Sequence, residues 1–249
     1  MSTNFYDKVA NKFGKYHTKA KYTVEFPAGE PEKVFKKKLL ELGGEQKVVL
    51  DAGCADGRFT LSMSLSFKKI VAIDMSEGML KAARRLQDKK NIKNIVFEKQ
   101  DAFRTSYKDK SFDLVYSRRG PTIFMEAFRL LKHGGYFIEI DIGEQDCKEI
   151  KKIFGRGQNF GEWDTQRKEI VMQKAGSAGF ETVFLKNFFY NEYYSSYEDL
   201  DLFLQGVPIF EDYSTEKDKV HLQKYVDKYI TEKGIKLERH RVVMVLQKP

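Results

Sequence analysis

The chain has 249 residues, of which 41% are hydrophobic and 14% aromatic, so it can fold into one large α/β domain, and global disorder is excluded. No stretch approaches the roughly 20 apolar residues of a membrane span, and the first residues lack the pattern of a secretion signal, so we expect a cytoplasmic protein without membrane contacts. The net charge of +8 is compatible with anionic partners such as RNA or carboxylates, although interleaved acidic residues favour a lysine-rich solubilising surface.

Residues 1–46 are predicted to form a helical segment that precedes the main domain at 47–249. An apolar stripe among lysines indicates a helix that packs on a sheet, and it consists of Val34, Phe35, Leu39, Leu40 and Leu42. Farther upstream, aromatic side chains are interleaved with lysines, and these are Phe5, Tyr6, Phe13, Tyr16 and Tyr22. This part is equally compatible with a lid over a bound ligand and with an ordinary amphipathic arm.

Strands and helices alternate from residue 47 onward. Short apolar runs predict strands at 47–51, 70–74, 95–98, 112–117 and 136–142. Helices are predicted at 58–66, 77–87 and 122–132, and Ser76 is the expected N-cap of the second. This alternation predicts a doubly wound, mostly parallel sheet with right-handed crossovers.

The regular alternation of strands and helices ends after Ile142. A short helix and a glycine-containing loop are expected at 143–164, then a helix at 165–178, an aromatic-rich strand at 180–194 and a last strand at 239–246. Residues 195–238 form an insertion before that last strand. We expect the insertion and the N-terminal segment to cover the active site, because an apolar roof suits a small-molecule pocket. Its apolar residues include Phe203, Leu204, Val207, Ile209 and Phe210.

A turn of small residues follows the first predicted strand, which ends in Asp51. Gly53, Ala55 and Gly57 would let the backbone approach a ligand at the carboxyl edge of the sheet, where doubly wound folds bind theirs. Asp74 lies at the tip of the second strand, where a carboxylate can accept both hydroxyls of a ribose. Together these residues indicate an adenosine-containing cofactor, and on these features alone a nicotinamide cofactor competes.

The spacing disfavours nicotinamide. The dinucleotide fingerprint is Gly-x-Gly-x-x-Gly, with a helix N-terminus aimed at a pyrophosphate. Here the small residues run Gly-x-Ala-x-Gly, and Asp51 precedes them. A carboxylate suits an ammonium group better than a pyrophosphate, and S-adenosyl-L-methionine carries an ammonium and no phosphate.

Residues 45–142 resemble the class I S-adenosylmethionine-dependent methyltransferases. Residues 50–57 (Leu-Asp-Ala-Gly-Cys-Ala-Asp-Gly) resemble the first motif of that family, 72–76 the second, 100–102 the third, 112–117 the fourth, and 130–135 (Leu-Leu-Lys-His-Gly-Gly) the turn before the fifth strand. The resemblance implies a seven-stranded sheet whose glycine loop holds the methionine part of the cofactor. Ala55 departs from the usual middle glycine, and His133 stands where proline is common.

The same resemblance assigns further cofactor contacts. Asp74 would bind the ribose, and Met75 would pack on the adenine. Asp101 would accept a hydrogen bond from the adenine amino group, and Ala102 would offer a backbone N–H. Ser117 would lie close to the methionine part.

Arg118 and Arg119 are the candidate residues on the substrate side. They follow the fourth predicted strand, where an arginine can grip a carboxylate or a phosphate with two hydrogen bonds. Pairing with nearby acidic residues is the equally weighted alternative. Asp141, at the end of the fifth strand, is a candidate base or substrate ligand, and a purely structural role is the alternative.

These features predict methyl transfer to an O or N atom of a small-molecule acceptor, which the arginines suggest is acidic. An RNA methyltransferase is the alternative, motivated by the net charge, and a non-catalytic binding module is a third reading. No Asn/Asp-Pro-Pro-aromatic run follows the fourth strand, and neither cysteine has a cytosine-methylase context, which disfavours two nucleic-acid chemistries. No metal site is expected, because Cys54, Cys147 and the histidines are scattered. A monomer or a homodimer is expected.

Overall fold

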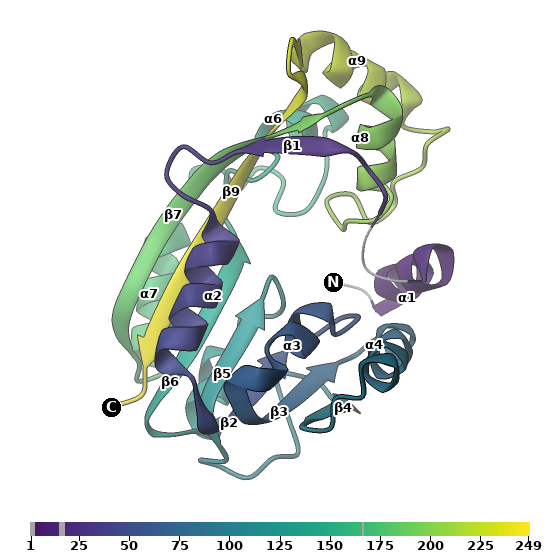
Figure 1. The fold of residues 1–249 in the computed structure, drawn as a ribbon. Coiled ribbons are helices and arrows are strands. Elements are labelled where there is room, and N and C mark those ends of the chain that lie inside the picture. Colours follow the sequence, from purple (N-terminus) through teal and green to yellow (C-terminus); the bar gives the residue numbers. More distant parts are fainter. Residues whose placement is uncertain (1–2, 15–17, 166) are drawn as a thin grey trace. The chain divides into compact units, whose positions relative to one another are not determined.

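The computed structural model describes residues 3–14, 18–165 and 167–249; Tyr16 of the N-terminal aromatic group lies outside them. The strands of these residues form one sheet in the order β1-β7-β9-β6-β5-β2-β3-β4, with β8 paired to β9 (Figure 1). The chain divides into two compact units. Unit 1 contains 1–30, 142–165 and 187–241, and unit 2 contains 31–141, 166–186 and 242–249.

Unit 2 holds the alternating part of the chain. Its elements are α2 (Pro31–Leu42), β2 (Gly44–Ala52), α3 (Arg58–Ser62), a 3-10 turn (Ser64–Ser66), β3 (Phe67–Asp74), α4 (Glu77–Lys90), β4 (Ile95–Lys99), β5 (Phe112–Arg118), α5 (Phe124–Leu130), β6 (Leu131–Ile142) and α7 (Arg167–Ser177). The pairs β2–β3, β2–β5, β3–β4 and β5–β6 are all parallel, which confirms the predicted doubly wound sheet.

Helices cover both faces of this parallel sheet. On one face, Phe35 of α2 and Phe59 of α3 contact the ring of Tyr116 in β5. The neighbouring Val115 points to the opposite face, because successive strand residues alternate. There it belongs to a buried apolar cluster with Phe124 of α5 and residues of α7. The carboxyl edge of the strands is thereby held between two packed helical layers.

Unit 1 has an apolar core of its own. The elements of unit 1 are α1 (Thr3–Phe13), β1 (Tyr22–Glu25), α6 (Lys148–Phe154), α8 (Tyr197–Leu204), α9 (Lys219–Tyr229) and β8 (Ile230–Thr231). The long strands β7 (Glu181–Tyr194) and β9 (Gly234–Gln247) each have residues in both units. Leu204, Ile209 and Phe210 of the predicted insertion are buried in this core, with Phe210 stacked on Phe154.

Two short strands raise the number in the sheet to nine, against the seven that the resemblance implied. β1 lies within the segment expected to be helical, so that expectation is wrong for Tyr22–Glu25. It pairs antiparallel with β7, and the rings of Tyr22 and Tyr194 lie 5.1 Å apart. β8 pairs with β9, which begins at Gly234 rather than at Arg239 as predicted.

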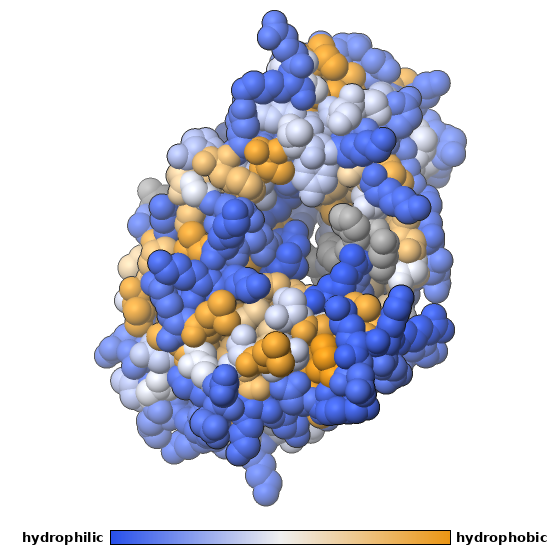
Figure 2. All heavy atoms as spheres, viewed as in Figure 1, coloured by the Kyte–Doolittle hydropathy of each residue, from blue (hydrophilic) through white to orange (hydrophobic). Residues whose placement is uncertain are grey.

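The surface seen in Figure 2 is mostly hydrophilic, and hydrophobic residues lie on it in separate groups. Within the described ranges, no helix has the length and apolar character needed to cross a membrane.

Candidate functional site

Three aspartates stand at the carboxyl ends of neighbouring parallel strands in unit 2. Asp51 lies near the end of β2, Asp74 ends β3, and Asp101 follows β4. In the register, Asp51 lies opposite Ala72 of β3, and Asp74 opposite Lys99 of β4. The structure therefore brings these three predicted residues to the same edge of the sheet.

The glycine turn after β2 uses left-handed backbone angles. φ is +85° at Gly53, +47° at Ala55 and +69° at Gly57. A Cβ atom on Gly53 would lie 2.9 Å from Pro121 Cδ, and one on Gly57 would lie 2.7 Å from Phe97 Cζ, so both positions require glycine. The N–H groups of Gly53 and Cys54 donate to the carbonyl of Ile73, which ties the turn to β3.

Backbone groups hold the Asp74 carboxylate in place. The N–H of Ala55 donates to Oδ2 over 2.9 Å, and the N–H of Ser76 donates to Oδ1 over the same distance. Ser76 in turn caps α4, because its Oγ accepts from the N–H of Met79. Each carboxylate oxygen can accept more than one hydrogen bond, so the geometry suits a ligand with two adjacent hydroxyls.

The Asp51 carboxylate is buried, and among the described residues its hydrogen-bond donors are neutral hydroxyl groups. Its Oδ2 accepts from Thr60 Oγ1 at 2.6 Å and from the Tyr116 hydroxyl at 2.9 Å. Burial raises the pKa of Asp51 to about 6, although these hydrogen bonds and the positive charge of Arg118 oppose the rise. A cationic ligand group would stabilise the ionised form.

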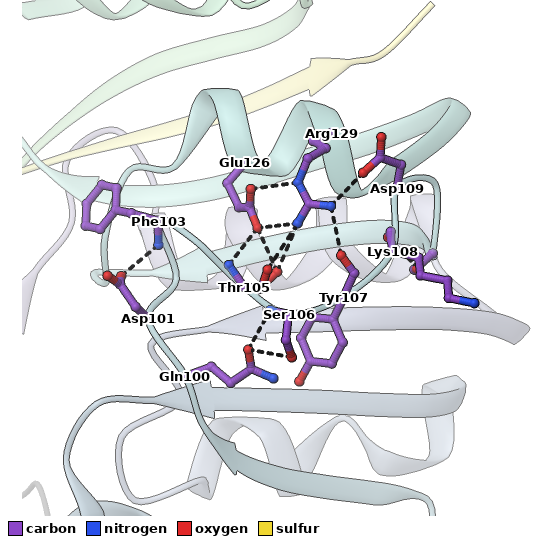
Figure 3. Close-up of polar contacts among 11 residues, drawn as sticks. Gln100, Asp101, Phe103, Thr105, Ser106, Tyr107, Lys108, Asp109, Glu126 and Arg129 are labelled. Carbon is purple, nitrogen blue, oxygen red and sulfur yellow. Dashed lines mark hydrogen bonds and ion pairs between the residues drawn. The ribbon is translucent and has the colours of Figure 1, made fainter.

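The loop after β4 carries the third aspartate and is anchored to α5. Asp101 Oδ1 accepts from the N–H of Phe103 at 2.9 Å. Figure 3 shows Arg129 at the centre of the anchor, where its guanidinium contacts Glu126, Asp109 and the carbonyl of Tyr107. Ala102 is buried, whereas Met75 on the neighbouring loop is 44% exposed.

A pocket of about 530 Å³ adjoins this loop on the side of α5 and α7. Its lining includes Phe103, Thr122, Met125 and Lys174. Phe103 and Met125 supply apolar surface, and Lys174 supplies one positive charge.

Both candidate arginines contact one carboxylate that sequence reasoning missed. Arg118 Nε donates to Glu32 Oε2 at 2.8 Å, and Arg119 Nε lies 3.5 Å from Glu32 Oε1. Glu32 lies in the first turn of α2. A glutamate there is common because it complements the helix dipole, so nothing in the sequence marked it as a partner of residues so far along the chain.

Asp141 pairs with Arg167, the first residue of α7. On the same strand, Glu139 is fully buried, and its Oε1 accepts from Thr122 Oγ1 at 2.9 Å. Burial, together with repulsion from Asp141, raises the pKa of Glu139 well above its usual range. Ser117 is also fully buried, and within the described chain its hydroxyl has no hydrogen-bond partner.

Comparison with known proteins places this site in a family. A family model described as a methyltransferase domain matches residues 44–188. The demethylmenaquinone methyltransferase of Lactococcus lactis is 31% identical over 116 residues, which are 43% of this chain and 46% of that protein. Phosphoethanolamine N-methyltransferase 3 of Arabidopsis thaliana is 33% identical over 112 residues, 41% of this chain and 22% of that protein. The matches thus span less than half the length of these relatives.

Solved structures share the fold. A Bacillus halodurans protein described as a putative methyltransferase aligns with a TM-score of 0.62 and 21% identity, covering 86% of this chain and 98% of that chain. A Deinococcus radiodurans protein of unknown function aligns with a TM-score of 0.65 and 18% identity, covering 99% and 100%. Because the family model matches more than half of the sequence, the chain belongs to the class I S-adenosylmethionine-dependent methyltransferase family.

Proposed function

We propose that the protein transfers a methyl group from S-adenosyl-L-methionine to an O or N atom of a small-molecule acceptor. The observation that carries the cofactor assignment is the row of carboxylates at one sheet edge, with Asp74 fixed by the N–H groups of Ala55 and Ser76. A pyrophosphate would be repelled there. Asp51, whose burial leaves it in need of a cation, fits the ammonium of the methionine part.

Each predicted cofactor residue has a role in this proposal. Asp51 and the turn at Gly53, Ala55 and Gly57 would hold the methionine part. Asp74 would accept from the ribose hydroxyls. On the adenine, Met75 would pack against the ring while Asp101 and the N–H of Ala102 bind its edge, and Ser117 would lie beneath the methionine part. The cofactor itself supplies an activated methyl group, so the chain chiefly aligns the acceptor with it.

The acceptor class rests on the named relatives and on the segments that lie outside the family match. Relatives are named for methylating demethylmenaquinone and phosphoethanolamine, and others for ribosomal RNA or ribosomal protein L11. The family model leaves most of 1–46 and all of 195–238 unmatched. We propose that these two segments contribute to recognition of the acceptor. Arg119 and Asp141 are separately proposed as acceptor contacts.

Thermal unfolding with added S-adenosylmethionine tests the cofactor assignment. The cofactor should raise the melting temperature of the wild type and of Asp212→Ala, a control at an exposed carboxylate. Asp74→Ala should lose that rise, because both backbone-held acceptor atoms disappear. A wild-type protein that shows no rise at millimolar cofactor contradicts the proposal.

An RNA acceptor is the second candidate, supported by the net charge of +8 and by the ribosomal RNA relative. Purified protein and cofactor with a labelled methyl group should label a component of a metabolite extract. Labelling of total RNA that disappears after ribonuclease treatment, with none in the extract, would instead establish the RNA alternative.

A further inference from the structure

We propose that Arg118 binds the carboxylate of the cofactor's amino-acid end. In the ligand-free protein, the carboxylate of Glu32 binds Arg118 instead. This inference rests on the proposed cofactor. It moves Arg118 from the acceptor side, where sequence reasoning put it, to the cofactor side. Glu32 then becomes an internal competitor of the cofactor.

The first observation is that Arg118 and Asp51 are linked through one packed pair of aromatic rings, Phe59 and Tyr116. Tyr116 and Arg118 point to the same face of β5, because they are two residues apart on one strand. Tyr116 donates to Asp51, and the ring of Phe59 contacts the ring of Tyr116 at 6.0 Å and the Arg118 guanidinium at 5.1 Å. Phe59 belongs to α3, the helix into which the glycine turn leads.

The second observation is charge complementarity. An α-amino acid presents an ammonium and a carboxylate side by side. β2 and β5 are neighbours, and Asp51 lies opposite Tyr116 in the register. Asp51 and Arg118 thus lie on adjacent strands, with Arg118 two residues beyond the register partner of Asp51, and the positive charge of Arg118 acts on the Asp51 carboxylate. The two strands therefore offer one negative and one positive group at the same edge of the sheet, the combination that such a zwitterion requires.

The third observation is that the Arg118–Glu32 contact can be replaced. Arg118 uses only Nε to bind Glu32, and within the described ranges its two terminal nitrogens make no hydrogen bond. The two side chains are 29% and 33% exposed, and partly exposed ion pairs contribute little to stability. Glu32 would keep a cationic neighbour after the exchange, because Arg119 Nε lies 3.5 Å from its other oxygen.

Calorimetric titration with two ligands tests the exchange. S-adenosylhomocysteine carries the ammonium and the carboxylate, whereas its decarboxylated analogue keeps only the ammonium. The wild type should bind the first about 10- to 100-fold more tightly, as expected for a charge-assisted bidentate contact. Arg118→Met should bring this ratio close to one, Arg118→Lys should restore part of it, and the control Arg85→Met, at an exposed arginine of α4, should leave it unchanged.

Glu32→Gln provides an independent arm, since it removes the competing charge and leaves Arg118 intact. It should tighten S-adenosylhomocysteine binding severalfold and leave the affinity for the decarboxylated analogue unchanged. A wild-type ratio retained in both Arg118 variants, or a ratio lost in Arg85→Met as well as in Arg118→Met, overturns the inference. A wild type that binds neither ligand overturns the proposed cofactor instead. If Arg118→Met does not fold, the binding ratios of Arg118→Lys and Glu32→Gln still test the exchange.

Discussion

Asp51 combines a buried carboxylate with hydroxyl donors, and no cationic side chain of the described residues bonds to it directly. Its pKa of about 6 in the folded protein lies above the ordinary value of 3.8. A raised carboxyl pKa means that the folded state binds a proton more tightly than the unfolded state does. The ligand-free protein should therefore lose stability as the pH rises from about 4 to 6, by about 2 to 3 kcal/mol from this group.

Asp51→Asn should remove this penalty while keeping an acceptor for the Thr60 and Tyr116 hydroxyls. We expect the ligand-free variant to gain about 1 to 2 kcal/mol in the free energy of unfolding at pH 7.5, and to lose that advantage near pH 4. Its S-adenosylhomocysteine affinity should fall, because the ammonium loses its carboxylate. Urea denaturation at the two pH values measures the first effect, and an equal gain at both would contradict the argument.

Ala55 is a non-glycine residue in the left-handed region, with φ +47°. That conformation costs an ordinary residue about 1 to 2 kcal/mol, and glycine's extra unfolded-state freedom costs about 0.5 to 1 kcal/mol. Ala55→Gly should therefore raise the free energy of unfolding by up to about 1 kcal/mol. Ala102→Gly is the control. Because φ at Ala102 is not positive, this variant should have a lower free energy of unfolding than the wild type. Comparing the two melting temperatures checks the sign.

At the scale of elements, the sequence pattern predicted those strands, turns and caps whose conformation depends on neighbouring residues. The apolar strands that carry Asp51 and Asp74, the glycine turn and the Ser76 cap were all predicted, because each depends on residues close in sequence. β1 was missed because four residues at a sheet edge take their conformation from β7, far along the chain. Glu32 was missed for the same reason, since Arg118 lies 86 residues away.

The loop between β4 and β5 depends on α5 for its conformation. Arg129→Met removes contacts to Glu126, Asp109 and the Tyr107 carbonyl, and we expect a loss of about 1 to 2 kcal/mol, since the arginine is partly exposed. Amide hydrogen exchange in 103–110 should become faster. Lys132→Met, which breaks only an exposed pair with Asp113, should leave exchange in that loop unchanged.

At the scale of the whole molecule, the two units hold buried charge differently. In unit 1, Asp146 accepts from Arg239 and Arg241, and Arg239 also donates to Glu192. Burial would raise the pKa of Asp146, but the two guanidinium groups lower it below its ordinary value. In unit 2, the buried carboxyls Asp51 and Glu139 instead have raised pKa values. In unit 1 the buried Asp146 and Glu192 carboxylates are thus paired with arginines, whereas in unit 2 the buried Asp51 and Glu139 carboxyls favour binding a proton or a cationic ligand group.

Asp146→Ala leaves two buried arginines without their shared carboxylate. We expect the free energy of unfolding to fall by about 3 to 5 kcal/mol, the usual result of breaking a buried ion pair. Hydrogen exchange should rise most within 142–165 and 187–241. Asp212→Ala, which removes an exposed partner of Arg156, should change stability by less than about 0.5 kcal/mol. Equal losses in the two variants would show that burial does not set the cost.

The glycine turn also contains a thiol, and its surroundings make that thiol chemically silent. Burial, and then the negative charges of Asp51 and Asp74, raise the pKa of Cys54 well above its ordinary value. Alkylating reagents attack the thiolate, so Cys54 should react only when the turn opens. Cys147 is buried as well, with a pKa of about 12, and gives little background. The rate of alkylation at Cys54 therefore reports how often the turn opens, and any ligand that closes the turn should slow it.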